Sequence, residues 1–145
     1  MQPSEKYETT SADETFELGK KFGSEAVAGS VYALDGDLGA GKTVFAKGFA
    51  EGLGITENVC SPTFTILQIY EGGRLELYHY DAYRIEDPSE MEEIGYTDYF
   101  YGDGTCLVEW PGNISEFLPD HYTMICIVRD PEKGFDNRKI TVTRI

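Results

Sequence analysis

Basic residues are scarce in this sequence of 145 residues, which has 12 lysines and arginines against 26 aspartates and glutamates. The formal net charge is −14 at pH 7, so phosphate backbones and anionic membranes should repel the chain. Contact with nucleic acid would therefore need a basic partner. The length supports one core, and we expect residues 1–145 to form a single domain.

Cysteines and long apolar runs are also few or missing. The 3 cysteines, Cys60, Cys106 and Cys126, are an odd number without metal-ligand spacing, which is typical of thiols in a reducing cytosol. The N-terminus has no apolar signal segment, and no apolar run is long enough to cross a membrane. We therefore expect a cytoplasmic protein.

Residues 36–43 satisfy the G-x-x-x-x-G-K-[ST] pattern of a phosphate-binding loop. In such a loop the glycines let backbone N–H groups approach a phosphate without an intervening Cβ atom. The lysine reaches the β- and γ-phosphates, and the final hydroxyl ligates Mg²⁺. The nucleotide-binding residues predicted by this pattern are Gly36, Asp37, Leu38, Gly39, Ala40, Gly41, Lys42 and Thr43.

The residues on either side of the loop have the pattern that the motif requires. Residues 31–34 are a short apolar run that predicts a buried strand, and residues 44–53 place apolar side chains at helical spacing. Strand, loop and helix therefore follow one another in the confirming order. The Asn-Lys-x-Asp sequence that selects guanine is absent, so we expect adenine as the base.

The remaining elements predict an α/β fold. A short edge strand at residues 6–10 precedes a capping box at 11–14, which begins a helix that we expect to end near Gly29. Two strand patterns meet at Gly72 and Gly73, a connection that is too short for a parallel crossover. The expected architecture is a P-loop NTPase-like three-layer fold with a mixed central sheet flanked by helices.

Two carboxylates are candidates for the metal-side role. Glu109 ends the apolar run 106–108, which is the pattern of a Walker B strand. Asp81 ends the second strand of the predicted hairpin and has the residue type more usual in that role. One would ligate Mg²⁺ and the other would orient the attacking water, and the sequence leaves that assignment open. With Lys42, they are the predicted catalytic residues.

Four further features each allow two interpretations. Ser61 and Thr63 flank a proline and form either a γ-phosphate sensor or a simple turn. His79 is either a base or ligand or, as we favour, a buried structural residue. Arg84 either stabilises transferred charge or forms a surface ion pair. The aromatic residues of 96–101 form either a partner surface or part of the core.

The arginines help to separate two classes of phosphate-loop protein. Small-molecule kinases usually use several arginines to hold a phosphorylated acceptor and close a lid. The arginines of this chain are scattered along the sequence, and there is no room for a lid insertion. A partner-responsive ATPase therefore fits better than the alternative, a small kinase that phosphorylates a small molecule or a protein.

Five stretches, in their order and spacing, resemble the TsaE (YjeE-type) ATPase family. They are the capping segment 11–19, the phosphate loop 36–43, Ser-Pro-Thr-Phe at 61–64, His-Tyr-Asp-Ala-Tyr-Arg at 79–84 and Val-Glu-Trp-Pro at 108–111. Ser-Pro-Thr-Phe and Val-Glu-Trp-Pro are weak motifs singly but specific together. Residues 98–100 follow the family pattern only loosely, and the tail is short.

The resemblance implies a cytoplasmic bacterial protein that binds ATP with Mg²⁺, hydrolyses it slowly and is required for threonylcarbamoyladenosine modification of tRNA. It implies two partner proteins, TsaB and TsaD, with tRNA contacted only through their complex, in which the ATPase resets the transferase TsaD. By the same analogy the residues around the metal would be Thr43, Asp81 and Glu109. Ser61 and Thr63 would line the phosphate end, and Trp110 would lie beside the site.

Overall fold

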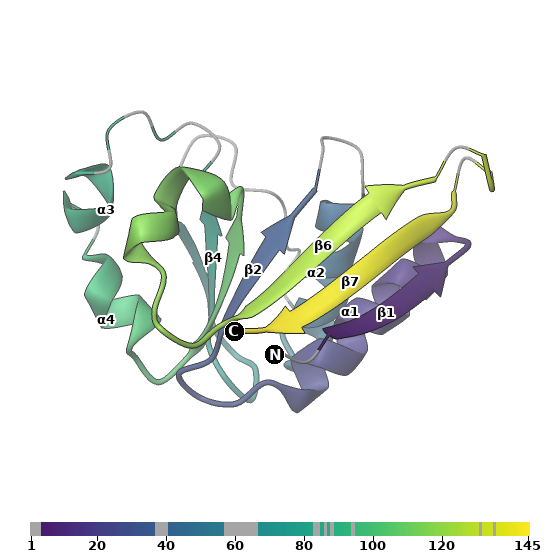
Figure 1. The fold of residues 1–145 in the computed structure, drawn as a ribbon. Helices are drawn as coiled ribbons and strands as arrows, with labels where there is room; N and C mark the ends of the chain where they lie inside the picture. Colours follow the sequence, from purple (N-terminus) through teal and green to yellow (C-terminus); the bar gives the residue numbers. More distant parts are fainter. Residues whose placement is uncertain are drawn as a thin grey trace.

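The computed structural model describes residues 4–36, 41–56, 67–82, 85, 87, 89–93, 95–130, 132–134 and 136–145. Within these ranges seven strands form one sheet in the order β1-β7-β6-β2-β5-β4-β3 (Figure 1). The strands are β1 (Ser4–Thr9), β2 (Val31–Asp35), β3 (Leu67–Tyr70), β4 (Leu77–Asp81), β5 (Thr105–Glu109), β6 (Thr123–Arg129) and β7 (Arg138–Arg144). The helices are α1 (Ala12–Glu25), α2 (Lys42–Gly52), α3 (Ser89–Glu93), α4 (Tyr96–Phe100) and the 3₁₀ helix η1 (Pro111–Phe117).

The sheet is parallel at its centre and antiparallel at both edges. Strand β2 pairs in parallel with β5 and β6, and β5 pairs in parallel with β4. Strand β3 runs antiparallel to β4, while β7 runs antiparallel to both β1 and β6. The predicted mixed sheet is confirmed, and the short glycine connection accounts for the antiparallel β3–β4 pair.

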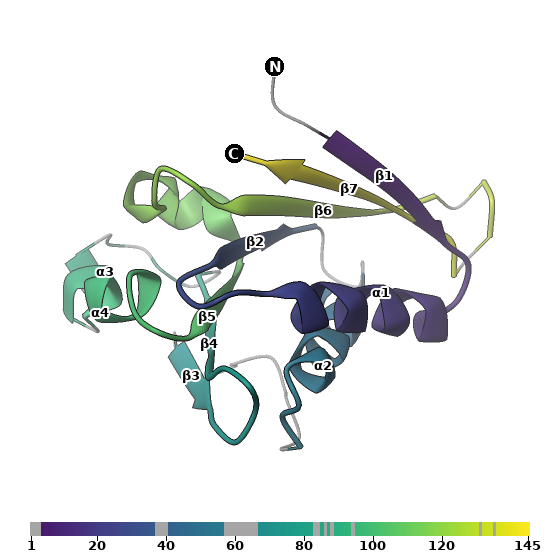
Figure 2. The same ribbon diagram turned by 90° about the horizontal axis from the view of Figure 1, so that it is seen from below.

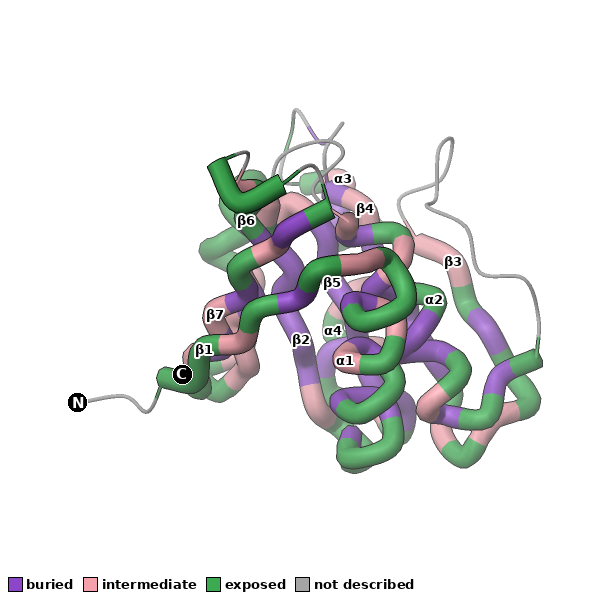
Figure 3. The backbone as a smooth tube through the Cα atoms, turned by 90° about the vertical axis from the view of Figure 1, so that its right-hand side faces the viewer, coloured by how far each residue is buried: buried purple, intermediate pink, exposed green. Residues whose placement is uncertain are grey.

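Helices cover both faces of the sheet, which gives the three layers that the sequence predicts. Helices α1 and α2 lie together on one face (Figure 2). On that face Phe22, Phe45 and Phe49 form one buried cluster with Leu34 and Leu107. Helices α3, α4 and η1 cover the opposite face of β4 and β5. Strands β2, β4 and β5 are the most deeply buried strands (Figure 3). No helix within the described ranges is long and apolar enough to span a bilayer.

Glycines bring α1 and α2 unusually close together. Gly19 and Gly23 of α1 face backbone carbonyls of α2, and Gly48 and Gly52 of α2 face backbone carbonyls of α1. A Cβ atom at any of the four positions would collide with the opposite backbone. The two helices therefore interlock through two G-x-x-x-G spacings, and α1 restricts where α2 can begin.

The ends of α1 are satisfied in different ways. The Ser11 hydroxyl accepts a hydrogen bond from the Glu14 backbone N–H at 3.1 Å, as the capping box predicts. The Glu14 carboxylate, however, accepts from the backbone N–H of Thr10 at 2.9 Å, one residue before the cap. The helix ends at Glu25, earlier than the expected end near Gly29, because Ala26 is already extended (φ −63°, ψ 140°).

A distant arginine completes the C-terminal end of α1. The Arg74 guanidinium, from the turn between β3 and β4, donates to the carbonyl oxygens of Ala26 at 2.8 Å, Gly23 at 2.9 Å and Ser24 at 3.2 Å. The last turn of α1 has no basic residue of its own. A cation therefore meets the negative end of the helix dipole and ties the hairpin to the helix.

The aromatic residues of α4 belong mainly to the core. The ring centroids of Tyr96 and Phe117 are 5.0 Å apart, and those of Tyr80 and Phe100 are 5.1 Å apart, both edge to face. Phe100 is buried, while Tyr101, just after the helix, is 65% exposed. The structure thus favours the core interpretation for most of this segment.

Candidate functional site

The candidate site lies where three parallel strands end and α2 begins. Asp35, Asp81 and Glu109 are the last residues of β2, β4 and β5. The sheet register pairs Leu34 with Glu109 and Asp81 with Glu109, so these strand ends meet at one edge of the sheet. In open α/β sheets the carboxyl ends of the strands are where ligands bind.

The N-terminus of α2 has the backbone geometry of an anion site. Gly41, its N-cap residue, has φ 105° and ψ 15°, a left-handed conformation that favours glycine. Gly41 has no side chain, so the N-cap residue itself provides no side-chain cap to the first turn of α2. The Gly36 N–H, at the start of the loop, donates to the Asp35 carboxylate at 3.0 Å.

Two residues that the sequence did not predict as site residues lie beside Gly41. A Cβ atom placed at Gly41 would be 3.6 Å from Arg138 Nε and 3.9 Å from Thr15 Cγ2. Arg138 comes from β7 and Thr15 from α1, so neither is near the loop in the sequence. Only the order of the strands and the packing of α1 on α2 bring them there.

Lys42 and Trp110 meet across the site. The Lys42 side chain is 6% exposed, and its ammonium lies 3.5 Å from the centroid of the Trp110 ring. Such a cation–π contact is worth roughly 0.5–2 kcal/mol, far less than a desolvated ammonium would gain from a phosphate. Trp110 itself has φ 58° and ψ 53° and is the one non-glycine residue with positive φ in the described part of the chain. Strain of this kind clusters at functional sites.

The two candidate carboxylates lie opposite each other on neighbouring strands. Glu109 is 3% exposed and its Oε2 is 2.7 Å from Nε2 of His79, which is fully buried. Asp81 is partly exposed at the end of β4. The interpretation of His79 as a buried residue holds, but local sequence gave no sign of its contact with Glu109, thirty positions later.

Several predicted site residues lie outside the described ranges, so the structure does not report on them. They are Asp37, Leu38, Gly39 and Ala40 of the loop, together with Ser61, Thr63 and Arg84. The structure brings together Gly41, Lys42, Trp110, Asp81 and Glu109 from α2, β4 and β5. Thr43 follows Lys42 in the first turn of α2.

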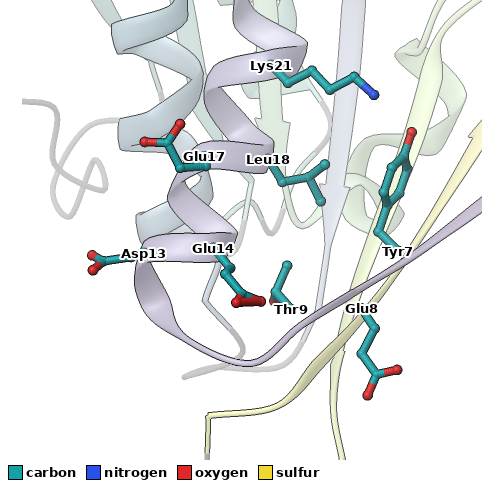
Figure 4. A pocket seen from close by; sticks show the side chains of 8 residues that line it. All are labelled: Tyr7, Glu8, Thr9, Asp13, Glu14, Glu17, Leu18 and Lys21. Carbon is teal, nitrogen blue, oxygen red and sulfur yellow. The ribbon is translucent and has the colours of Figure 1, made fainter.

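A separate hollow of about 430 Å³ lies between β1 and the outer side of α1 (Figure 4). Tyr7 and Leu18 form its apolar part, and the charged lining has four carboxylates against one lysine: Glu8, Asp13, Glu14, Glu17 and Lys21. Such a rim repels phosphates. This hollow contains none of the strand-end or α2 residues, so it is distinct from the candidate site.

Comparisons with known proteins agree on one family. Residues 9–140 match the family described as threonylcarbamoyl adenosine biosynthesis protein TsaE. The chain is 51% identical over 140 residues to a tRNA threonylcarbamoyladenosine biosynthesis protein TsaE of Bacillus subtilis, covering 97% of this chain and 85% of the relative. It is 45% identical to that of Treponema pallidum, covering 91% and 95%. A crystal structure of Bacillus subtilis YdiB superposes with a TM-score of 0.86 at 45% identity, covering 100% of this chain and 88% of that one.

Proposed function

The chain belongs to the TsaE family of tRNA threonylcarbamoyladenosine biosynthesis proteins, and we propose that it serves this pathway as a slow, Mg²⁺-dependent ATPase. The partners in this proposal are the TsaB and TsaD proteins, and tRNA is contacted only through their complex. The family assignment supplies the pathway. The ATPase activity rests on the geometry at the start of α2.

The observation that carries the proposal is the junction of α2 with the ends of β4 and β5. A helix N-terminus that begins with a left-handed glycine, a buried lysine and two strand-end carboxylates are the features expected of a nucleotide phosphate site. In the proposed complex the loop 36–43 binds the phosphates, and Lys42 leaves the Trp110 ring to contact the β- and γ-phosphates. Ser61 and Thr63 line the phosphate end.

The side chains present fit a magnesium ion bound together with a nucleotide. Thr43, Asp81 and Glu109 supply oxygen atoms, which are the donors that Mg²⁺ prefers. The described residues contain no group of three His, Cys, Asp or Glu side chains able to hold a metal alone. Mg²⁺ commonly completes its shell with substrate phosphates and water, so a sparse protein set is suitable. When bound, the ion would neutralise charge on the phosphates.

Asp81 and Glu109 take the two remaining roles, at the metal and at the attacking water. One ligates the metal, and the other accepts a proton from, or orients, the water that attacks the γ-phosphate. The longer and almost fully buried Glu109 side chain suits the water, and the partly exposed Asp81 suits the metal. In this proposal slow hydrolysis resets the transferase TsaD between its cycles.

The first prediction concerns Lys42→Ala. We expect ATP affinity to fall by about tenfold or more, because the charge on the β- and γ-phosphates is lost. Trp110 is the only tryptophan of the chain and contacts Lys42, so its fluorescence should report the binding. Lys47→Ala, an exposed lysine on the same helix, is the matched control and should bind ATP like the parent chain.

Phosphate release from ATP should be measured in parallel, with and without TsaB and TsaD. Stimulation by the partners and its loss in Glu109→Ala would support the proposal. Unchanged ATP affinity in Lys42→Ala would refute the site. Transfer of the γ-phosphate to a small molecule or protein, in place of release to water, would favour the kinase alternative.

A further inference from the structure

We propose that His79 is a positioning residue for this site, because its imidazole fixes the carboxylate of Glu109 in a single orientation. The inference rests on the proposed ATPase function for its consequence in turnover. The hydrogen bond from His79 Nε2 to the Glu109 carboxylate can be tested independently of any activity.

The sheet register sets up the contact. His79 pairs with Leu107 on β5, and Asp81 pairs with Glu109. Alternate residues of a strand share a face, so His79 and Asp81 point to the same side of β4, and Leu107 and Glu109 to the same side of β5. Leu77 and Leu107 belong to the core beneath α1 and α2, which places all four residues on the α2 face.

The contact is buried at both ends. His79 is 0% exposed, Glu109 is 3% exposed, and the distance from Nε2 to Oε2 is 2.7 Å. The Glu109 backbone is fixed as well, because its carbonyl oxygen accepts from the Ala82 N–H at 3.1 Å. With the main chain and one carboxylate oxygen held, the other oxygen has little freedom to turn away from the site.

The surroundings of the ring indicate which nitrogen carries the proton. His79 Nδ1 is buried and has no hydrogen-bond partner among the described residues. A proton there would be a buried donor without an acceptor, which costs free energy. A proton on Nε2 instead meets a carboxylate oxygen. The Nε2–H tautomer therefore satisfies both the ring and Glu109.

Filling the core alone would not require an imidazole at this position. A leucine at position 79 could pack beside Leu77, but it would leave the buried Glu109 carboxylate without this hydrogen-bond donor. A buried imidazole is useful there if its task is to hold Glu109, in the way that outer residues orient catalytic carboxylates.

A direct test is the tautomer of His79, read from long-range ¹H–¹⁵N NMR spectra of the folded chain. The chain has 2 histidines, and His121→Gln assigns the signals. We expect a proton on Nε2, with its resonance shifted in Glu109→Ala. A ring protonated on Nδ1 alone, or one insensitive to Glu109, would overturn the proposal even if the ATPase activity were never detected.

The second test separates turnover from binding. In His79→Leu we expect kcat for ATP to fall by about 10- to 100-fold while the Kd for ATP, from Trp110 fluorescence, changes little. His79→Gln keeps an N–H donor near the Nε2 position and should recover part of kcat. Tyr80→Phe is the matched control, since it alters the adjacent fully buried residue on the opposite face of β4.

The outcomes of the second test distinguish the two proposals. Unchanged kcat in His79→Leu, or equal losses in the leucine and glutamine variants with intact melting temperatures, would overturn the positioning role. Absence of hydrolysis by the parent chain, alone and with TsaB and TsaD, would instead refute the proposed function and leave the tautomer experiment to decide the contact.

Discussion

Glu109 is held in place by residues that are far from it in the sequence. The Glu109 side chain contacts His79 of β4. The Glu109 carbonyl oxygen accepts a hydrogen bond from the backbone N–H of Ala82, the residue that follows β4. Trp110, the next residue, turns the chain in a left-handed conformation and covers the Lys42 ammonium. The chemistry proposed for a single carboxylate thus depends on several precisely oriented neighbours.

Glu8 gives a prediction about pH at the same scale. The Asn137 amide donates to its carboxylate at 2.8 Å, and the Lys133 ammonium is 3.6 Å away. The hydrogen bond from Asn137, followed by the charge of Lys133, lowers the pKa of Glu8 below its ordinary value of 4.5. The folded chain therefore binds this proton less readily than the unfolded chain, so Glu8 contributes stability above pH 4.5 that is lost as the pH falls through the folded pKa.

We therefore expect Glu8→Gln to melt at a lower temperature than the parent chain at neutral pH, with the difference disappearing under acid conditions. Thermal unfolding followed by circular dichroism over a pH series measures this. Part of the difference should persist in about 0.5 M NaCl, where charges are screened beyond a few ångströms, because the hydrogen bond from Asn137 is weaker to a neutral amide oxygen than to a carboxylate. A difference that grew on acidification would contradict the assignment.

Helices α1 and α2 show how one element places another. Their glycines allow backbone-to-backbone contact, so the position of α1 on the sheet restricts the start of α2, where the phosphate loop ends. Periodicity predicted an apolar face for this helix at Thr15, Leu18, Phe22 and Ala26; Thr15, Phe22 and Ala26 are buried, and Leu18 is partly buried. It did not predict that Gly19 and Gly23 would be the points of closest approach.

Gly48→Ala tests this packing. Alanine is favoured over glycine in an exposed helix by about 1 kcal/mol, but here its Cβ atom would collide with the carbonyl group of Phe16. We expect the free energy of unfolding to fall by about 1–3 kcal/mol, measured by urea denaturation. Gly112→Ala, where a Cβ atom meets nothing within 4 Å, is the control and should be nearly neutral. Equal stabilities of the two variants would show that the helices can separate without cost.

For the whole molecule, charge determines which contacts are open to it. The net charge of −14 opposes binding to a phosphate backbone, whereas an ATP molecule can be bound by a local cluster of N–H groups and one buried lysine. This division agrees with a family that serves tRNA modification.

We accordingly expect the isolated chain to show no saturable binding to tRNA in 50 mM salt up to about 100 µM, the weak limit of non-specific binding by basic proteins. Fluorescence anisotropy of labelled tRNA measures this, and a mixture with TsaB and TsaD serves as the positive control. Salt-sensitive binding by the chain alone would contradict the expectation.

What the sequence by itself determined is local: the Ser11 cap, the alternation along β4, the apolar run of β5 and the pattern of the phosphate loop. These follow from neighbouring residues, because helix periodicity, strand alternation and loop sterics act over a few positions. The mixed character of the sheet could also be predicted, because the lengths of the connections limit which strands can pair in parallel.

Tertiary structure alone decided which distant side chains meet. The contacts of His79 with Glu109, Lys42 with Trp110 and Arg74 with the end of α1 join segments 30 to 68 positions apart, and no periodicity encodes them. They arise because strand order and register bring particular residues to one edge, and because close helix packing sets where α2 begins. The phosphate loop could be read from the sequence; the orientation of the residues that would act on its ligand required the fold.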